Sequence, residues 1–144
     1  MSAPHEPNVF TVREHVRYAE TDQMGVAYYG TYPIWFEVGR TRLMAARGMP
    51  YGEVEARGYI LPVSETYYRL LAPARYEDPI DIDTWIEKIE SRRVTFGYRI
   101  RRGETELAEG WTRLICVDTD FRPCRFPAWL TDALTAAGKS RDDD

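Results

Sequence analysis

The sequence is poor in the residues that build metal centres and disulfide-stabilised folds. Its 144 residues include two cysteines, Cys116 and Cys124, and two histidines, His5 and His15. Two thiols do not make a disulfide framework in a chain of this length, so we expect both to be reduced, with Cys116 a small core residue. Neither histidine has a histidine, cysteine or acidic residue at metal-ligand spacing. The sequence therefore predicts no metal site.

Long apolar runs and a basic charge balance are also missing. No segment approaches the roughly 18 apolar residues needed to span a bilayer. The N-terminal residues MSAPHEPNVF have neither the basic start nor the apolar stretch of a signal peptide. The formal net charge of −4 argues against a general nucleic-acid binder, which would carry a basic face. We expect a cytoplasmic protein that neither inserts into a membrane nor binds nucleic acid.

Familiar catalytic and phosphate-binding motifs are absent as well. The sequence has no GxSxG nucleophile elbow and no glycine-rich loop placed after a strand. Its composition is otherwise ordinary for a globular protein, and its length suits one domain. We expect a single domain over residues 1–144, with disordered tails at about 1–8 and 138–144.

The clearest predicted element is a helix over residues 31–47. Thr31 can cap its first amides, Pro33 fits its first turn, and Gly48 ends it. Apolar residues recur three or four positions apart on one face, and a second apolar set lines another face. The first set is Tyr32, Trp35, Phe36, Gly39, Leu43 and Ala46, and the second is Ile34, Val38 and Ala45. A helix that is apolar on two sides is expected to be buried.

Strands are predicted on both sides of this helix. Alternation of Val94, Phe96, Tyr98 and Ile100 with polar residues has the period of a half-buried strand. The predicted strands are about 9–18, 60–71, 80–91, 93–102 and 105–118, with turns at 76–79 and 102–104, a helical turn or two at 50–57 and a short helix at about 128–137. Strands segregated from one buried helix indicate an α+β fold whose antiparallel sheet curves around that helix.

Two carboxylates, Glu20 and Asp22, lie in the loop ETDQMGVAYYGTY that leads into the helix. The first amides of a helix lack intrahelical partners and the helix dipole is positive there, so they can hold a developing oxyanion. A carboxylate facing those amides makes a centre for acyl transfer, either by direct attack or by drawing a proton from water. On position alone, however, Asp22 is better explained as a residue that caps a turn or helix amides.

The segment VRYAETDQMGVAYYGTYPIWFEVGRTRLM resembles the signature of the 4-hydroxybenzoyl-CoA thioesterase family of hotdog proteins, which includes the Tol–Pal-associated acyl-CoA thioesterases. The family pattern is TDxxGxVYYxxYxxxFExxR, and similarity continues through LPVSETYYRLLAPARYEDPIDIDTWIEKI and VTFGYRIRR, so it covers nearly everything from Val9 to Asp118. The resemblance implies a single hotdog domain, a curved antiparallel sheet wrapped around one long helix. It also implies hydrolysis of acyl-CoA thioesters to free acid and CoA, without a metal or bound organic cofactor, since CoA is part of the substrate.

The resemblance also implies roles for individual residues. Asp22 is the catalytic carboxylate, and the backbone N–H of Tyr29 polarises the thioester carbonyl. The residues implied to bind substrate or CoA are Thr31, Ser91, Arg92 and Arg93. Arginine suits phosphates because it offers forked donors, although an exposed, solvated cluster explains the two arginines equally well. Whether Asp22 attacks directly or activates water stays open.

Supporting residues and departures from the family pattern lie nearby. Glu37 and Arg40 are three apart on the helix and are expected to pair, either in support of catalysis or, more simply, to hold the helix against a neighbouring subunit. Thr31 stands where many members have asparagine, and Arg42 where an acidic residue is frequent. The pair 26–27, valine and alanine, replaces a bulkier pair, which is expected to affect acyl preference.

Two alternative functions remain from the sequence. One is hydrolysis of acyl groups carried by acyl carrier protein on the same fold, and the other is a non-catalytic acyl-CoA-binding protein. A hotdog dehydratase fits poorly, because neither histidine lies on the central helix. The resemblance further implies a homodimer or homotetramer with active sites shared between subunits, and the exposed strand edge of a single copy favours such pairing.

Overall fold

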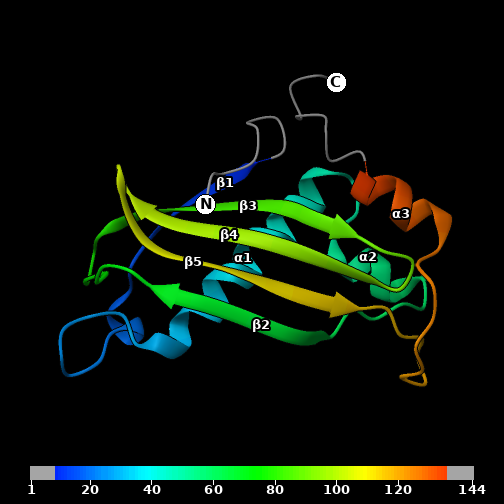
Figure 1. Cartoon of the computed structure of the whole chain (residues 1–144), viewed down its shortest axis with the longest axis horizontal. Coiled ribbons are helices and arrows are strands. Elements are labelled where there is room, and N and C mark those ends of the chain that lie inside the picture. The colour runs from blue at the N-terminus through cyan, green and yellow to red at the C-terminus, as the bar shows by residue number, and fades with distance from the viewer. Residues whose placement is uncertain (1–8, 136–144) are drawn as a thin grey trace.

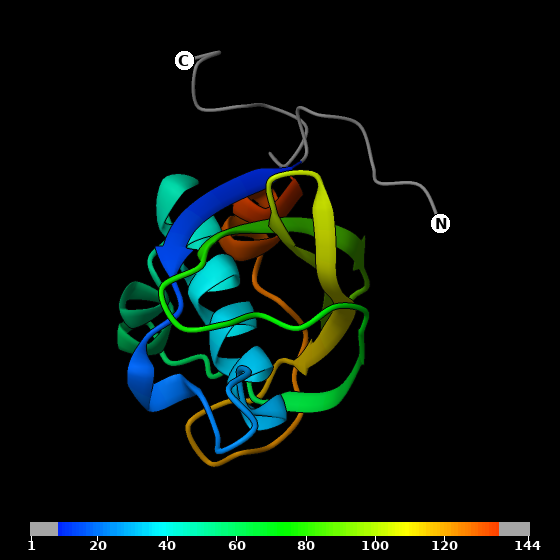
Figure 2. The same ribbon diagram turned by 90° about the vertical axis from the view of Figure 1, so that its left-hand side faces the viewer.

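A computed structural model describes residues 9–135 as one curved antiparallel sheet around a long helix (Figure 1). The strand order is β1-β3-β4-β5-β2, and helix α1 lies within the curve of the sheet (Figure 2). The strands are β1 (Phe10–His15), β2 (Val63–Leu70), β3 (Pro79–Ile89), β4 (Arg93–Arg102) and β5 (Thr105–Ile115). The helices are α1 (Tyr32–Ala46), α2 (Tyr51–Ala56) and α3 (Ala128–Thr135), with 3-10 turns at Tyr18–Glu20 and Tyr29–Thr31. The predicted α+β hotdog architecture is confirmed.

The central strands form because their apolar residues recur at every second position. Ile82 of β3 pairs with Ile100 of β4, and both are fully buried in the core. The bounds of β4 agree with the prediction, and the other strands begin or end within a few residues of their predicted positions. Strand β2 starts at Val63 and not at residue 60, because Pro62 has no N–H to donate to the ladder.

Helix α1 packs on the concave face through the first of its two predicted apolar faces. The Phe36 ring stacks on Tyr98 with 4.2 Å between centroids. Gly39 allows the helix to approach the sheet closely, since an added Cβ would lie 2.1 Å from Oγ1 of Thr84. Gly48, with φ of +82°, follows the helix in the left-handed conformation that ends it, as predicted.

The second apolar face of α1 is not buried within one chain, so that part of the prediction is wrong. Ile34 is 55% exposed, Ala45 is exposed and Val38 is only partly covered. The sheet curves around one side of the helix and leaves the other side without a partner from the described residues (Figure 2). An apolar strip near the start of α1 is therefore available for contact with another molecule.

The convex face of the sheet carries a charged cluster around a carboxylate that is closed against solvent. Asp83 of β3 is fully buried and accepts hydrogen bonds from Thr11 Oγ1 at 2.7 Å, Arg99 Nε at 2.9 Å and Arg101 Nε at 2.7 Å. Both oxygens of the carboxylate are used, because Arg101 Nη2 also reaches Oδ1 at 3.2 Å. The cluster ties β1, β3 and β4 together.

Some predicted segments fall partly or wholly outside residues 9–135. These are the tails at about 1–8 and 138–144, together with residues 136–137 of the last predicted helix. Within the described range, no helix is both long enough and apolar enough to span a membrane.

Candidate active site

Asp22 lies in a tight loop that closes on itself just before α1. Its amide donates to the Val26 carbonyl at 3.0 Å, and its carbonyl accepts from the Gly25 amide at 2.9 Å. Gly25 takes φ of +81°, which glycine adopts without strain. The Asp22 carboxylate accepts one hydrogen bond, from the Met24 amide to Oδ1 at 2.9 Å. Oδ2 accepts none from residues 9–135, so one oxygen is free to act on a ligand.

Glu20, two residues earlier, uses its carboxylate to hold the loop against the helix. Its side-chain oxygens accept from the Arg17 amide at 2.8 Å, Arg17 Nη1 at 3.0 Å and Trp35 Nε1 at 3.1 Å. The Glu20 carbonyl accepts from the Tyr28 amide at 2.8 Å. With 11% of its side chain exposed, Glu20 anchors the loop and is not available to a ligand. The two carboxylates therefore have different tasks.

Tyr29 is the first residue of the 3-10 turn that runs directly into α1. An amide in a helical turn donates to the carbonyl of a residue three or four positions earlier, and no earlier residue belongs to this turn. The Tyr29 amide is therefore an uncapped donor at the start of the helical segment. Its carbonyl is held by the hydroxyl of Tyr68, from β2, at 3.0 Å. The Asp22 loop and the Tyr29 amide therefore both lie at the start of α1.

Thr31 does not cap the helix through its side chain, and that prediction is wrong. Its backbone, with φ of −75° and ψ of −29°, is already helical because of the 3-10 turn, whereas a capping residue needs an extended backbone. The hydroxyl instead donates to the Glu20 carbonyl at 3.1 Å, and the residue is buried. Thr31 thus helps to hold the loop against the helix start.

Tyrosines surround the uncapped amide. The rings of Tyr28 and Tyr29 lie 4.7 Å apart, and both are largely exposed. A hydrogen bond with Tyr29 raises the pKa of Tyr28, and the nearby charge of Asp22 raises it further. The Tyr28 hydroxyl therefore keeps its proton at neutral pH and lies within electrostatic reach of the Asp22 carboxylate.

Two cavities border the Asp22 loop. A polar one of about 530 Å³ is lined by Tyr18, Thr21, Asp22, Gln23, Gly25 and Tyr76. An apolar one of about 280 Å³ is lined by Val26, Ala27, Tyr32, Leu70, Leu71, Ala72 and Pro73. The loop thus separates a polar space from an apolar one, and Asp22 opens on the polar side.

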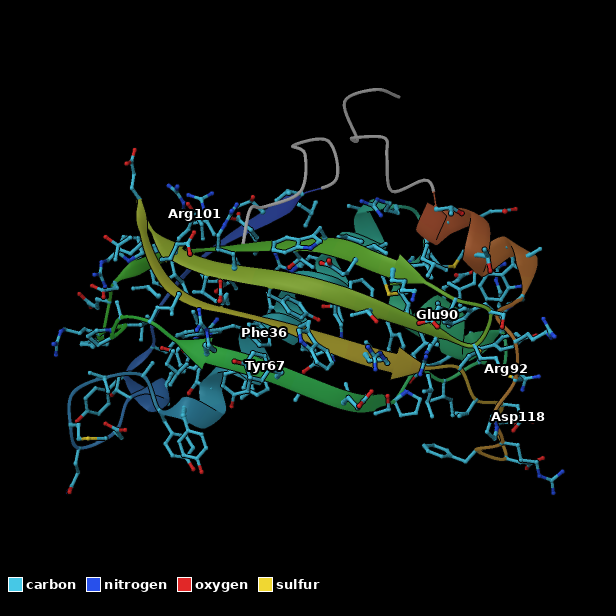
Figure 3. The ribbon with its side chains drawn as sticks, in the orientation of Figure 1. Phe36, Tyr67, Glu90, Arg92, Arg101 and Asp118 are labelled. Atoms are coloured by element: carbon cyan, nitrogen blue, oxygen red, sulfur yellow. The ribbon has the colours of Figure 1, made fainter. Side chains whose placement is uncertain are left out.

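Ser91, Arg92 and Arg93 lie at the other end of the molecule. Ser91 and Arg92 lie in the turn between β3 and β4, where Arg92 is labelled in Figure 3, and Arg93 begins β4. Arg93 pairs with Ile115, whereas Arg102 at the other end of β4 donates to the Pro73 carbonyl near the Asp22 loop, so about 30 Å of β4 separates the two regions. Within one chain the structure does not bring these residues to Asp22.

The predicted pair of Glu37 and Arg40 does not form, which corrects the sequence interpretation. Glu37 is exposed, whereas Arg40 Nη1 donates to the Tyr98 hydroxyl at 3.4 Å. The Tyr98 hydroxyl also shares a hydrogen bond with Thr112 Oγ1. A buried phenol needs polar partners, and this need directs the arginine toward the sheet. Burial raises the pKa of Tyr98, so its hydroxyl stays protonated.

Sequence reasoning missed several residues near Asp22, namely Tyr28, Tyr68 and the apolar run 70–73. A usable indication was present, because two leucines end the predicted strand and an alanine and a proline follow it with no matching polar alternation. His15 ends β1, three residues before Tyr18 of the polar cavity, His5 lies outside the described residues, and Cys116 is buried after β5 at the other end of the sheet. No cluster of three or more metal-ligating residues occurs among residues 9–135.

Comparisons with known proteins show which family the chain is similar to. The model of the thioesterase-like superfamily matches residues 16–134. Bacillus subtilis YneP, whose name provisionally assigns it to the acyl-CoA thioesterases, is 37% identical over 88% of this chain and 93% of its own length. Escherichia coli YbgC, named an acyl-CoA thioester hydrolase, is 30% identical over 72% of this chain and 78% of its own.

Solved structures give the same result. The crystal structure of a DHNA-CoA thioesterase from Staphylococcus aureus superposes with a TM-score of 0.83 at 34% identity, covering 89% of each chain. Similarity thus extends over both the fold and most of the sequence, including the loop that carries Asp22.

Proposed function

The chain belongs to the thioesterase-like superfamily and is a thioester hydrolase, and we propose that it converts acyl-CoA thioesters to free acid and CoA. The observation that carries this proposal is the free oxygen of Asp22, in the loop that leads into the uncapped start of the helical segment. A carboxylate and an oxyanion donor are the two groups that thioester hydrolysis requires of the protein.

In the proposed mechanism the Tyr29 amide holds the thioester oxygen as it becomes an oxyanion. Asp22 then acts in one of two ways. It attacks the carbonyl carbon and forms an anhydride as CoA thiolate leaves, after which water releases the acid, or it takes a proton from the water that attacks. Single-turnover hydrolysis in heavy-oxygen water distinguishes these routes, because direct attack labels Asp22 and the water-mediated route labels only the product acid.

The apolar cavity supports a place for the acyl group. Val26 and Ala27 form one wall, and the run 70–73 forms another. Because Ala27 is buried and small, replacing it by leucine is expected to reduce the volume and shift preference toward shorter acyl groups. A panel of acyl-CoAs of increasing chain length measures this shift.

We place the CoA phosphates near Arg92 and Arg93 of a partner subunit. Strand β2 is an edge strand with seven of its eight residues exposed, including Val63 at 45% and Leu70 at 49%. Antiparallel pairing of two β2 edges about a two-fold axis sets the Leu70 end of one chain beside the Val63 end of the other. The Val63 end also carries the β3–β4 turn, so this arrangement sets Asp22 of one chain on the same side as Arg92 and Arg93 of the other.

A mixing experiment tests this homodimer. Asp22→Asn in one chain and the pair Arg92→Ala, Arg93→Ala in another should each lower activity at subsaturating substrate. Randomly mixed dimers should recover about a quarter of wild-type activity, because half of them are heterodimers with one intact site. No recovery, or a fully active monomer in light scattering, would contradict the shared site.

Turnover itself is tested by CoA release from acyl-CoA substrates, followed with a thiol reagent. The same acyl groups are offered on acyl carrier protein and on a short thioester without the nucleotide. Preference for the carrier would favour acyl-carrier-protein hydrolysis, and tight binding without turnover would favour a binding protein.

We also propose a cytoplasmic location and a reaction without a metal ion. Activity that a chelator abolishes and zinc or magnesium restores would contradict the latter.

A further inference from the structure

The two cysteines, eight residues apart in the sequence, meet in space at the end of β5. Their Sγ atoms are 3.5 Å apart. Cys116 is fully buried and Cys124 is partly exposed, and both are free thiols. No other cysteine occurs in the sequence, so each thiol has one possible partner within the chain.

The backbone holds the two residues directly opposite each other. Val117 bridges Pro123 in antiparallel fashion, and the Cys124 amide donates to the Cys116 carbonyl at 3.0 Å. Directly opposed residues of an antiparallel pair have Cα atoms about 4.5–5.5 Å apart, within the range of about 4.4–6.8 Å that disulfides span. The chain therefore needs only side-chain rotation to join the sulfurs.

The surroundings of the pair differ between its two members. Burial, together with the neighbouring Cys124, raises the pKa of Cys116 to about 12, so that thiol keeps its proton at neutral pH. Cys124 is partly exposed, and two exposed arginines, Arg122 and Arg125, flank it in the sequence; neither forms an ion pair with a carboxylate among residues 9–135. Positive charge around an accessible thiol attracts anionic reagents.

From this geometry we propose that Cys116 and Cys124 form a redox-active dithiol site that reacts with low-molecular-weight disulfides to give an intramolecular disulfide. Cys124 is the attacking residue and Cys116 is the resolving residue. The bond joins the end of β5 to the segment after the loop 117–123. The site is distinct from Asp22, which lies at the opposite end of the sheet, and does not depend on the proposed hydrolysis.

The reaction consists of two thiol–disulfide exchanges. The Cys124 thiolate attacks one sulfur of oxidised glutathione, whose S–S bond breaks to release one glutathione thiolate and leave a mixed disulfide. Cys116 then loses its proton to solvent and attacks Cys124 Sγ, and the second glutathione leaves as a thiolate. Two protein thiols are oxidised to one disulfide, and one oxidised glutathione is reduced to two glutathione molecules.

The test treats the folded, full-length protein with oxidised glutathione and measures its intact mass. The wild-type chain should become lighter by two hydrogen atoms and lose both free thiols, and a reductant should reverse the change. Proteolysis should recover one peptide pair linked through Cys116 and Cys124. A stable product with two glutathione adducts, or no reaction while the unfolded chain reacts, overturns the proposal.

Two single variants assign the order of attack. Cys116→Ser should stop at a mixed disulfide on Cys124, whereas Cys124→Ser should leave the buried Cys116 unmodified. Faster modification of Cys116 in Cys124→Ser than of Cys124 in Cys116→Ser overturns the assigned roles. Circular dichroism establishes that each variant is folded, and the wild-type mass measurement stands even where a variant is not.

Thermal unfolding provides an independent measurement. Closing a short loop restricts the unfolded chain, so the oxidised protein should melt about 5 °C above the reduced one. The double variant Cys116→Ser, Cys124→Ser should show no change on oxidation. An equal or lower melting temperature for the oxidised wild type would show that the sulfurs are not in register for a bond.

Discussion

The loop before α1 and the convex face of the sheet each fix an aspartate in place, but they use its oxygens differently. Asp83 on the sheet gives both oxygens to protein donors and is fully buried. Asp22 in the loop gives one oxygen to the Met24 amide and keeps the other for a ligand. A carboxylate with all its acceptors filled stabilises structure, whereas one with a free oxygen beside an oxyanion donor is suited to chemistry.

The difference between the two aspartates follows from how each backbone segment is held. Asp83 belongs to a central strand whose neighbours supply arginines at fixed register. Asp22 belongs to a loop that another carboxylate, Glu20, fastens to the helix through Trp35. The loop therefore keeps its position without using both oxygens of the Asp22 side chain.

Asp22→Asn should have the largest effect on activity and little effect on stability. We expect kcat/KM on the best acyl-CoA to fall about a thousandfold or more, because a central nucleophile or base is lost. The melting temperature should stay close to that of the wild type, since the Met24 amide can still donate to the amide oxygen. Retention of more than a tenth of wild-type activity would remove Asp22 from its assigned role.

Asp83→Asn should reverse this pattern. Losing this buried charge removes the carboxylate that Arg99 and Arg101 share, although Arg101 keeps its ion pair with Asp81, and we expect the free energy of unfolding to fall by about 3 kcal/mol. The kcat/KM of the folded protein should be unchanged. Urea unfolding measures the loss of stability, and initial rates on the same preparation measure kcat/KM. A large loss of kcat/KM would mean that the convex face takes part in catalysis.

Glu20→Gln is the matched control for the catalytic carboxylate. A glutamine can still accept from Trp35 Nε1 but loses the charge that pairs with Arg17, so the loop should loosen. We expect kcat to fall about tenfold with little change in KM, because a misplaced Asp22 reacts more slowly on substrate that is still bound. If this change is more damaging than Asp22→Asn, the wrong carboxylate has been assigned.

The smallest expected effect concerns the pH dependence of stability. Burial raises the pKa of Asp83, but the hydrogen bonds from Arg101, Thr11 and Arg99 outweigh it and leave the pKa below its ordinary value of 3.8. Because the pKa of Asp83 is lower in the folded than in the unfolded protein, its ionised carboxylate stabilises the fold at any pH above the unfolded-state pKa. This stabilisation is lost as the pH falls through the folded-state pKa. Below about pH 4 the stability of wild type and Asp83→Asn should therefore converge. If the free energies of unfolding of the two proteins stayed equally far apart as the pH was lowered, this prediction would be wrong.

Local pattern was enough to predict much of the fold. Strand β4 was predicted at its observed bounds, because the alternation of residues 93–102 is a property of the segment alone. The end of α1 before Gly48 and the turn at Gly103, with φ of +61°, likewise follow from the conformational freedom of glycine. The resemblance of residues 16–44 to a thioesterase signature pointed to Asp22 and Tyr29 as well.

The amino-acid sequence by itself thus determined the elements, the hotdog family and the loop that carries the candidate carboxylate. Only the tertiary structure decided which partner each polar group takes. Arg40 turns to Tyr98, 58 residues away, and not to Glu37 three residues before it. Thr31 bonds back to Glu20. Arg92 and Arg93 lie at the far end of the sheet from Asp22, and the two thiols lie side by side. Periodicity describes which face a residue occupies, but the partner on that face comes from chain segments that are distant in sequence.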